Sequence, residues 1–385
     1  MTFLNLIGSM ATSVTENTLP FLALITVLVF VHEMGHFLVA RYNGVRIEVF
    51  SIGFGPELWG RTDRRGTRWK VSMVPLGGYV KMFGEGDMVT GVDDAEDRPM
   101  TPEERAVSFH HKRLAQRAAI VFAGPLANFV FAIVVMTGLF AAVGTPKPLS
   151  GVGQIQPDSA AAAAGFKTGD TIVAIDGQAI RWFDDLRNIV SRNPGKSLRF
   201  DIVRNNRDIT LDATPARHVL EASQKGVAPR VIGLLGVSPD PAQVIYQRMG
   251  IVQAVEHGVG RTYAMTAGIM DALGQMIRGT RNANELGGPI SIAIVSADVA
   301  QTGLINMMML AAAFSVNLGL LNLFPVPMLD GGHLVFYAFE ALRGRPLSQR
   351  TQEYGFRFGL VLVFLLMIFA TWNDFVRLFA RFGGL

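Results

Sequence analysis

The most reactive side chains of this sequence lie in an apolar stretch near its beginning. His32, Glu33 and His36 follow one another in the order H-E-x-x-H. On a helix, residues four apart lie on one face, so His32 and His36 can bind one metal ion together. Two imidazoles with this spacing are typical of a Zn²⁺ site, and the glutamate between them then lies beside the metal as a general base. The pattern predicts metal-assisted hydrolysis.

A catalytic zinc needs a third protein ligand and an open position for water. Asp330 is the first candidate, because apolar residues flank it and Pro325 and Pro327 interrupt the helical pattern just before it. His32 is about 20 Å along a helix that begins at Leu19, a depth that matches the expected end of the apolar segment before Asp330. His333 is a rival ligand, but it follows a Gly-Gly pair, which favours a position in solvent or beside the site.

The composition is that of a membrane protein with sizeable polar parts. Half of the 385 residues are hydrophobic and 17% are charged. The net charge of +4 does not indicate a nucleic-acid partner. The absence of cysteine excludes disulfides and thiolate metal ligands. The sequence therefore favours a lipid bilayer as the surroundings of the reactive stretch.

Four apolar segments are long enough to cross a bilayer. They cover about residues 19–40, 118–143, 304–329 and 358–372. No Lys or Arg precedes Arg41, so we expect the first segment to be a retained membrane helix rather than a signal peptide. Lys and Arg gather after the first segment, before the second and after the third, which predicts that these loops are cytoplasmic. Both termini and the region of residues 144–303 are then outside.

These segments divide the chain into four predicted regions. Residues 1–143 form an N-terminal membrane part, in which short strands bounded by Gly and Pro predict a β-hairpin between Arg46 and Gly84. Residues 144–218 alternate short strands with one helix, an α+β unit with an edge suited to extended peptides. Residues 219–303 form a helical connector outside the membrane, with a helix expected over 241–280. Residues 304–385 form the C-terminal membrane part.

Several motifs together resemble those of bacterial site-2 proteases of the RseP type, which are intramembrane zinc metalloproteases. The matching motifs are HEMGH, FSIGFGP, PLGGYVKMFGE, FAGPLANF and PVPMLDGGH, which extend over nearly the whole chain. The resemblance implies that His32, His36 and Asp330 bind zinc and that Glu33 is the catalytic glutamate. It implies that Asn322 contacts substrate near the metal. It further implies that residues 151–215 form a PDZ domain and that the hairpin is membrane-associated.

The expected fold is therefore a polytopic α-helical membrane protein with about four transmembrane helices, a cytoplasmic β-hairpin and an inserted extracytoplasmic PDZ-like domain. The resemblance implies a location in the bacterial inner membrane, with this domain on the periplasmic side. It also implies single-pass membrane proteins as substrates, such as anti-sigma factors or signal-peptide remnants. Peptide termini or segments are the expected partners of the PDZ-like domain. Close relatives can carry two such domains where this sequence shows one clear copy. The pattern of residues 216–300 indicates helix, and a degenerate second copy there is the alternative.

A helical substrate must unwind to expose the bond that is cut, and an edge strand can hold the unwound stretch. The alternating strand from Lys70 to Val74 is the first choice for this role. Val71, Ser72 and Met73 are therefore predicted substrate-binding residues. Two other functions compete with proteolysis: a zinc-binding membrane transporter and a non-proteolytic peptide-binding scaffold. Neither needs Glu33, so a Glu33→Gln variant separates them from a protease.

Overall fold

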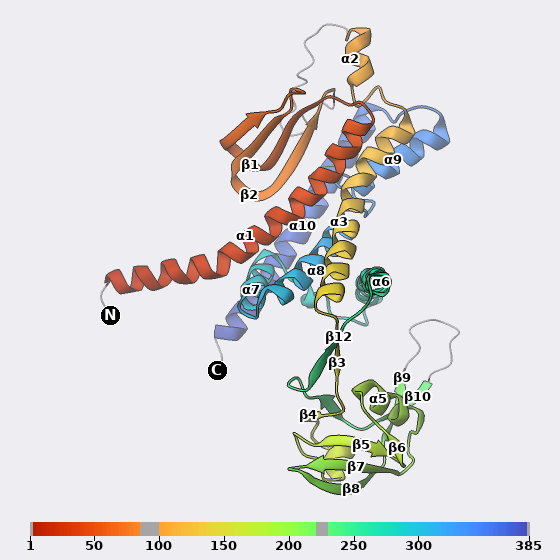
Figure 1. The fold of residues 1–385 in the computed structure, drawn as a ribbon. Helices are drawn as coiled ribbons and strands as arrows, with labels where there is room; N and C mark the ends of the chain where they lie inside the picture. The colour runs from red at the N-terminus through yellow and green to blue at the C-terminus, as the bar shows by residue number, and fades with distance from the viewer. Residues whose placement is uncertain (1–2, 85–99, 221–229, 383–385) are drawn as a thin grey trace. The chain divides into compact units, whose positions relative to one another are not determined.

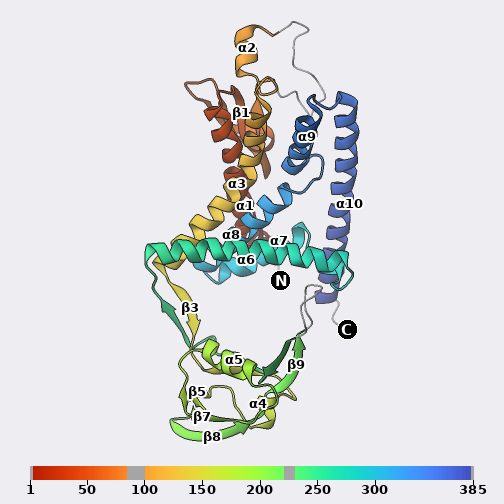
Figure 2. The same cartoon turned by 90° about the vertical axis from the view of Figure 1, so that its right-hand side faces the viewer.

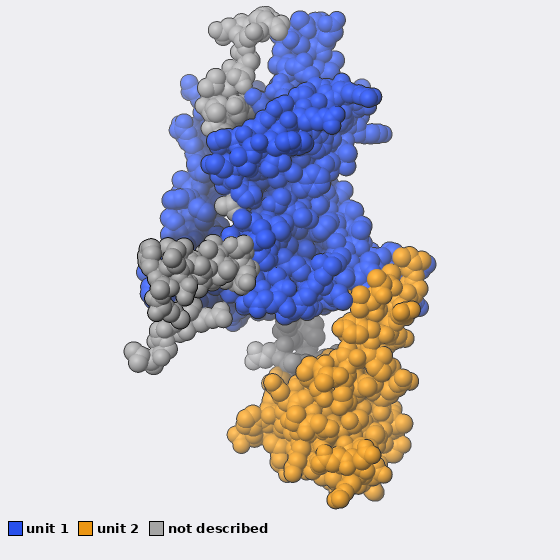
Figure 3. All heavy atoms as spheres, turned by 60° about the vertical axis from the view of Figure 1, so that its left-hand side comes forward, with its two compact units in different colours: residues 1–139, 252–385 blue, residues 140–251 orange. Residues whose placement is uncertain are grey.

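The computed structural model describes residues 3–84, 100–220 and 230–382. The chain divides into two compact units, coloured separately in Figure 3. The helical unit comprises Met1–Leu139 and Val252–Leu385, and the inserted unit comprises Phe140–Ile251. Every functional side chain predicted above belongs to the helical unit.

Figure 1 shows the elements of the helical unit. Its helices are α1 (Phe3–Tyr42), α2 (Pro102–Val107), α3 (Leu114–Ala142), α6 (Ile251–Ile277), α7 (Pro289–Gln301), α8 (Leu304–Asn322), α9 (Asp330–Arg343) and α10 (Gln349–Phe382), with a 3₁₀ turn at Ala283–Glu285. Its strands are β1 (Ile47–Thr62) and β2 (Arg68–Met82). In Figure 2, α6 runs crosswise to α3 and α10.

Within the described residues, four helices are long and apolar enough to cross a membrane, as predicted. These segments are Thr18–Tyr42, Leu114–Ala142, Leu304–Asn322 and Arg350–Phe379. The third is shorter than predicted because the helix ends before the two prolines, and residues 323–329 form a turn. The fourth is longer than predicted because the charged residues on either side of its apolar stretch continue the same helix.

The predicted hairpin folds back on itself. Residues 49–52 of β1 pair with residues 78–81 of β2 on one side and with residues 68–71 of the same strand on the other. Residues 57–62 pair with the outer side of residues 68–72. The order across this sheet is therefore 57–62, 68–72, 49–52 and 78–82.

An aromatic cluster joins this sheet to α1 one residue beyond the H-E-x-x-H motif. The rings of Phe37, Phe50 and Trp69 have centroids 4.6–5.5 Å apart. Phe50 and Phe37 are buried. Burial of rings of this size is a large favourable term, so the cluster fixes β1 and β2 against the helix that carries His36.

A carboxylate from α10 caps another helix. The side chain of Asp374 accepts hydrogen bonds from the backbone N–H groups of Gly288, Ile290 and Ser291 at 2.9, 3.0 and 3.1 Å. These are donors at the start of α7 that no helical carbonyl can satisfy. The cap ties α10 to the rest of the helical unit, although most of the apolar side chains of α10 are exposed.

The inserted unit contains a four-stranded sheet with the order β6-β5-β7-β8. Its elements are β3 (Thr145–Pro148), β4 (Val152–Ile155), α4 (Ala160–Ala163), β5 (Thr171–Ile175), β6 (Gln178–Ala179), α5 (Phe183–Arg192), β7 (Leu198–Arg204), β8 (Arg207–Ala213), β9 (Ala216–Leu220), β10 (Arg230–Leu234), β11 (Val237–Pro239) and β12 (Val244–Gln247). The strands and helix predicted between residues 151 and 215 are all present. Phe200, Ile172 and Leu186 lie at the centre of its apolar core.

The prediction for residues after 216 needs correction. These residues were expected to be helical, but they form β9–β12, and the helix expected over 241–280 spans only Ile251–Ile277. Strands β9 and β10 pair with each other. The other two have partners far back in the sequence: β11 pairs with β4, and β12 pairs with β3. The compact unit consequently extends over Phe140–Ile251, beyond the predicted region 144–218.

Candidate metal centre

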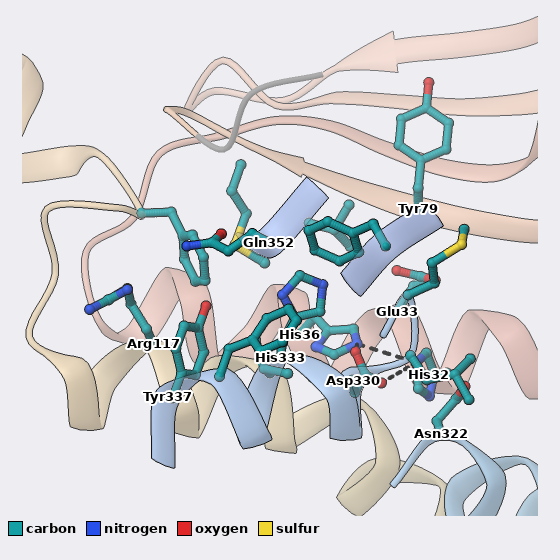
Figure 4. Close-up of a pocket in the computed structure, with 18 of the residues that line it drawn as sticks. His32, Glu33, His36, Tyr79, Arg117, Asn322, Asp330, His333, Tyr337 and Gln352 are labelled. Atoms are coloured by element: carbon teal, nitrogen blue, oxygen red, sulfur yellow. Dashed lines mark hydrogen bonds and ion pairs between the residues drawn. The ribbon is translucent and has the colours of Figure 1, made fainter. Parts of the chain in front are cut away.

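The three predicted ligands, His32, His36 and Asp330, lie close together. Most of the chain separates the two histidines from Asp330 in the sequence. The nearest side-chain nitrogens of His32 and His36, both Nε2, are 3.2 Å apart. Oδ2 of Asp330 lies 3.1 Å from His32 Nε2, and Oδ1 lies 3.5 Å from His36 Nε2 (Figure 4). Within the described residues, this is the group of His, Asp and Glu side chains that can hold a metal ion.

The geometry of the three side chains fits zinc. In a tetrahedral zinc site with ligand bonds of about 2.0–2.1 Å, neighbouring ligand atoms are about 3.3 Å apart. The closest approaches among the three side chains, 3.1–3.5 Å, are near this value, although a different oxygen of Asp330 faces each histidine. Oδ2 of Asp330 is buried and has no hydrogen-bond partner. A buried carboxylate oxygen without a donor is costly, and a cation bound between it and the two imidazoles removes that cost.

Close helix contacts hold the two histidines in place. A Cβ on Gly35 would lie 2.2 Å from the main-chain oxygen of Ala123, so α1 and α3 touch there through their backbones. A Cβ on Gly124 would lie 2.2 Å from His36 Nε2. His36 Nδ1 is 2.9 Å from the Ile120 carbonyl, which accepts its proton and leaves Nε2 free for a metal.

The turn between α8 and α9 presents Asp330. Its Met328 has a φ of 89°, a left-handed conformation that costs a residue with a side chain about 1–2 kcal/mol. Gly331 follows, and a Cβ there would lie 2.3 Å from the carbonyl oxygens of Leu323 and Phe324. The break and the glycine place the first residue of α9 against the end of α8, where Asp330 can reach α1.

A cavity of about 640 Å³ opens beside the three donors. Glu33, Asn322 and His333 line it together with Gly78 and Tyr79 of β2. Glu33 lies against the sheet, since a Cβ on Gly78 would be 3.3 Å from its Cγ. His333 lines the cavity without joining the three-donor group, and burial lowers the pKa of its imidazole.

The far part of the cavity wall contains an ion pair that the sequence did not predict. Arg117 of α3 donates to Glu340 of α9, and its guanidinium lies 4.9 Å from the centre of the Tyr337 ring. All three line the cavity, and Arg117 and Tyr337 are labelled in Figure 4. The ion pair joins α3 to α9 at the wall of the cavity. The sequence gives no signal for this pair, because Arg117 lies in a basic run before an apolar segment and Glu340 is far from it along the chain.

The predicted substrate strand does not reach the cavity. Residues 68–71 have β1 on both sides, so Val71 lies in an interior strand with no free edge. Ser72 is buried with its Oγ 3.3 Å from Ser51 Oγ, while Met73 is exposed. Alternation of apolar and polar residues identified a strand but could not tell an interior strand from an edge, because pairing is decided by distant residues. The cavity is instead lined by residues 77–80.

Comparison with known proteins identifies the family. The model of peptidase family M50 matches residues 20–366 of this chain. The chain belongs to peptidase family M50. This is the site-2 protease family, so the enzyme is a site-2-type metalloprotease. The match includes the H-E-x-x-H motif and the Asp330 turn, whose side chains meet at the metal centre.

Individual relatives align with this chain over almost their whole length. A protein of Agrobacterium fabrum that carries the name of a zinc metalloprotease is 44% identical over 94% of this M50 peptidase and 96% of its own length. One of Rhizobium meliloti with a similar name is 44% identical over 94% and 98%. The regulator of sigma-E protease RseP of Salmonella typhimurium is 34% identical over 95% and 100%. That alignment covers 463 positions, more than the 385 residues of this peptidase, so the Salmonella protein has internal residues without a counterpart here.

Proposed function

We propose that this M50 peptidase binds Zn²⁺ through His32, His36 and Asp330 and hydrolyses peptide bonds within or near transmembrane segments. The observation that supports this most strongly is the approach of the three side chains, whose nearest nitrogen and oxygen atoms are 3.1–3.5 Å apart, beside a cavity that Glu33 also lines. A binding or transport site has no need of a carboxylate at the position of Glu33. The names of the relatives, which include zinc metalloproteases, point in the same direction.

The division of labour follows from the positions of the side chains. When bound, zinc is a Lewis acid that polarises the scissile carbonyl and makes water a stronger nucleophile at neutral pH. Glu33 accepts the proton of the attacking water and passes it to the leaving nitrogen. Asn322, at the end of α8, lines the same cavity and can hold the substrate main chain through its amide.

The strand at residues 78–82 supplies the edge on which we propose that the substrate binds. It pairs with residues 49–52 on one side, and Gly78, Tyr79 and Val80 line the cavity. An unwound substrate can add to this strand through main-chain hydrogen bonds. Tyr79→Pro and Val80→Pro each remove one N–H, and neighbouring N–H groups point to opposite sides of a strand. One of the two variants is therefore expected to slow cleavage more strongly than the other, and equal rates would contradict strand addition here.

The inserted unit is proposed to act as a PDZ-like filter that binds peptide termini or segments of single-pass membrane proteins. In support, residues 151–215 form the predicted strands and helix around one apolar core. The distribution of Lys and Arg supports a periplasmic location for this unit in the bacterial inner membrane, with the β1–β2 sheet on the cytoplasmic side. Deleting residues 151–215 is expected to leave zinc and some cleavage while relaxing substrate choice. Complete loss of cleavage in a zinc-loaded, folded variant would contradict a filter.

A Glu33→Gln variant tests the enzyme class. Glutamine has nearly the same shape as glutamate but cannot accept the proton of water. We expect cleavage of a membrane-helix substrate to fall by about 10²–10⁴-fold, while the zinc content of the purified protein stays at one per chain. Uncut membrane fragments that accumulate in cells with this variant would identify the natural substrates. Wild-type cleavage by the variant would exclude this mechanism.

A further inference from the structure

A buried asparagine touches one of the two histidines. Asn128 lies in the middle of α3 and has no exposed surface. Its side-chain amide is 3.1 Å from Nδ1 of His32, the ring nitrogen that does not face the other two donors. A buried amide at membrane depth is costly unless it is hydrogen-bonded, so such residues usually have a function.

A serine from α8 holds the other side of this amide. Ser315 is fully buried, and its Oγ is 2.9 Å from the main-chain oxygen of Asn128. The same Oγ is 3.4 Å from the side-chain amide atom assigned as Oδ1. The helices are close at this point, since a Cβ on Gly319 would lie 3.1 Å from Asn128 Cβ. Asn128 is thus held between His32 and Ser315.

Counting protons decides which way the amide points. The oxygen and nitrogen of an asparagine side chain are assigned from hydrogen bonding. With the amide nitrogen facing His32, Nδ1 would be the acceptor and the ring proton would be on Nε2, the atom that must bind metal. The single proton of Ser315 would also have to serve both oxygens of Asn128.

The opposite orientation gives His32 Nδ1, the Asn128 side chain and Ser315 Oγ compatible partners. Asn128 Oδ1 then accepts the proton of His32 Nδ1, which leaves Nε2 without a proton and facing Asp330. The amide nitrogen donates to Ser315 Oγ, and the Ser315 hydroxyl donates to the Asn128 main-chain oxygen. We infer that Asn128 is a positioning residue that fixes the metal-binding tautomer and ring orientation of His32, and that Ser315 in turn orients Asn128. This inference rests on the proposed role of His32 as a ligand.

The two histidines differ in how they are oriented. His36 donates to a main-chain carbonyl, that of Ile120, which no substitution removes. His32 depends on a side chain, so its half of the site can be weakened by a single substitution. The sequence places this side chain in the FAGPLANF motif, where an asparagine among apolar residues is the signal.

Zinc affinity of the purified full-length protein, measured by competition with a chelator, tests the inference. Asn128→Leu removes the acceptor at similar volume, and loss of such a partner weakens metal binding by about 10–100-fold. Asn128→Asp keeps an acceptor and has no donor, so we expect zinc to bind at least as tightly as in the wild type. Ser315→Ala leaves the Asn128 acceptor in place and is expected to have a smaller effect than Asn128→Leu.

Each outcome has a distinct meaning. Unchanged affinity in Asn128→Leu overturns the positioning role, and weak binding in Asn128→Asp overturns the acceptor orientation. His32→Ala is the reference: if it keeps full zinc affinity, the proposed metal site itself is wrong. If the Asn128 variants do not fold, nitrogen NMR of the zinc-loaded wild type decides, because the inference requires a proton on His32 Nδ1. An unprotonated Nδ1 overturns it.

Discussion

The metal centre and the core of the inserted unit are built in different ways. At the metal centre, helices approach until backbone and functional side chains touch, as Gly124 does against His36. In the inserted unit, apolar side chains such as Phe200 and Ile172 fill a shared interior. A change of volume at the metal centre moves a proposed ligand atom directly. The same change in the inserted unit alters the free energy of unfolding and moves no ligand.

Among the variants that test this comparison, Asp330→Ala is expected to have the largest effect on cleavage and zinc binding. It removes one of three donors and leaves two imidazoles, which is fewer than a catalytic zinc requires. We expect no detectable cleavage and less than one zinc per chain, with an unchanged inserted unit. Metal analysis and an activity assay on the same preparation check this. Full activity would show that another residue is the third ligand, and His333 would be the next candidate.

Gly124→Ala should separate ligand position from helix stability. The added methyl would lie 2.2 Å from His36 Nε2, so the imidazole must move. A displacement of about 1 Å at a catalytic group can reduce the rate by about 10²-fold. Gly138→Ala is the matched control in the same helix, because nothing lies within 4 Å of a Cβ there. Similar cleavage rates and zinc affinities in the two variants would contradict the proposal that the metal centre is sensitive to added volume at Gly124.

Phe200→Ala probes the other side of the comparison. Phe200 is fully buried in the inserted unit, and such truncations typically cost about 3–5 kcal/mol of unfolding free energy. We expect this unit to unfold at a lower temperature than in the wild type, with one zinc still bound per chain. Limited proteolysis between residues 140 and 251 measures the unfolding. A loss of zinc equal to that of Gly124→Ala would show that the two regions are not separable in this way.

The smallest expected effect is at the turn between β1 and β2. Burial raises the pKa of Asp63, but hydrogen bonds from the backbone N–H groups of Arg65 and Thr67 outweigh it and lower the pKa. A lowered carboxyl pKa stabilises the fold at neutral pH, and this contribution is lost as the pH falls below about 4. Acid unfolding followed by tryptophan fluorescence should therefore be less pH-dependent in Asp63→Asn. An identical acid transition in both proteins would show that the turn contributes nothing.

Local sequence signals predicted more of this protein than its long-range pairing. The four apolar helices, the break before Asp330 and the strands between residues 151 and 215 follow from periodicity, proline and glycine. The pairing of residues 49–52 with two parts of β2 could not be predicted. Distant residues decide which strand lies at the edge of the sheet. Strands β11 and β12 depend in the same way on their distant partners β4 and β3. The amide of Asn128 became meaningful only when α1 and α3 were seen together.

The distance along the chain between His36 and Asp330 has a consequence for biosynthesis. A ribosome that adds about 5–20 residues per second needs roughly 15–60 s to pass from the first two ligands to the third. During that time the emerging polypeptide has the histidines and Glu33 but lacks the carboxylate that completes the centre. With Asp330 as the proposed third ligand, proteolytic competence is acquired only after α8 and α9 have been made.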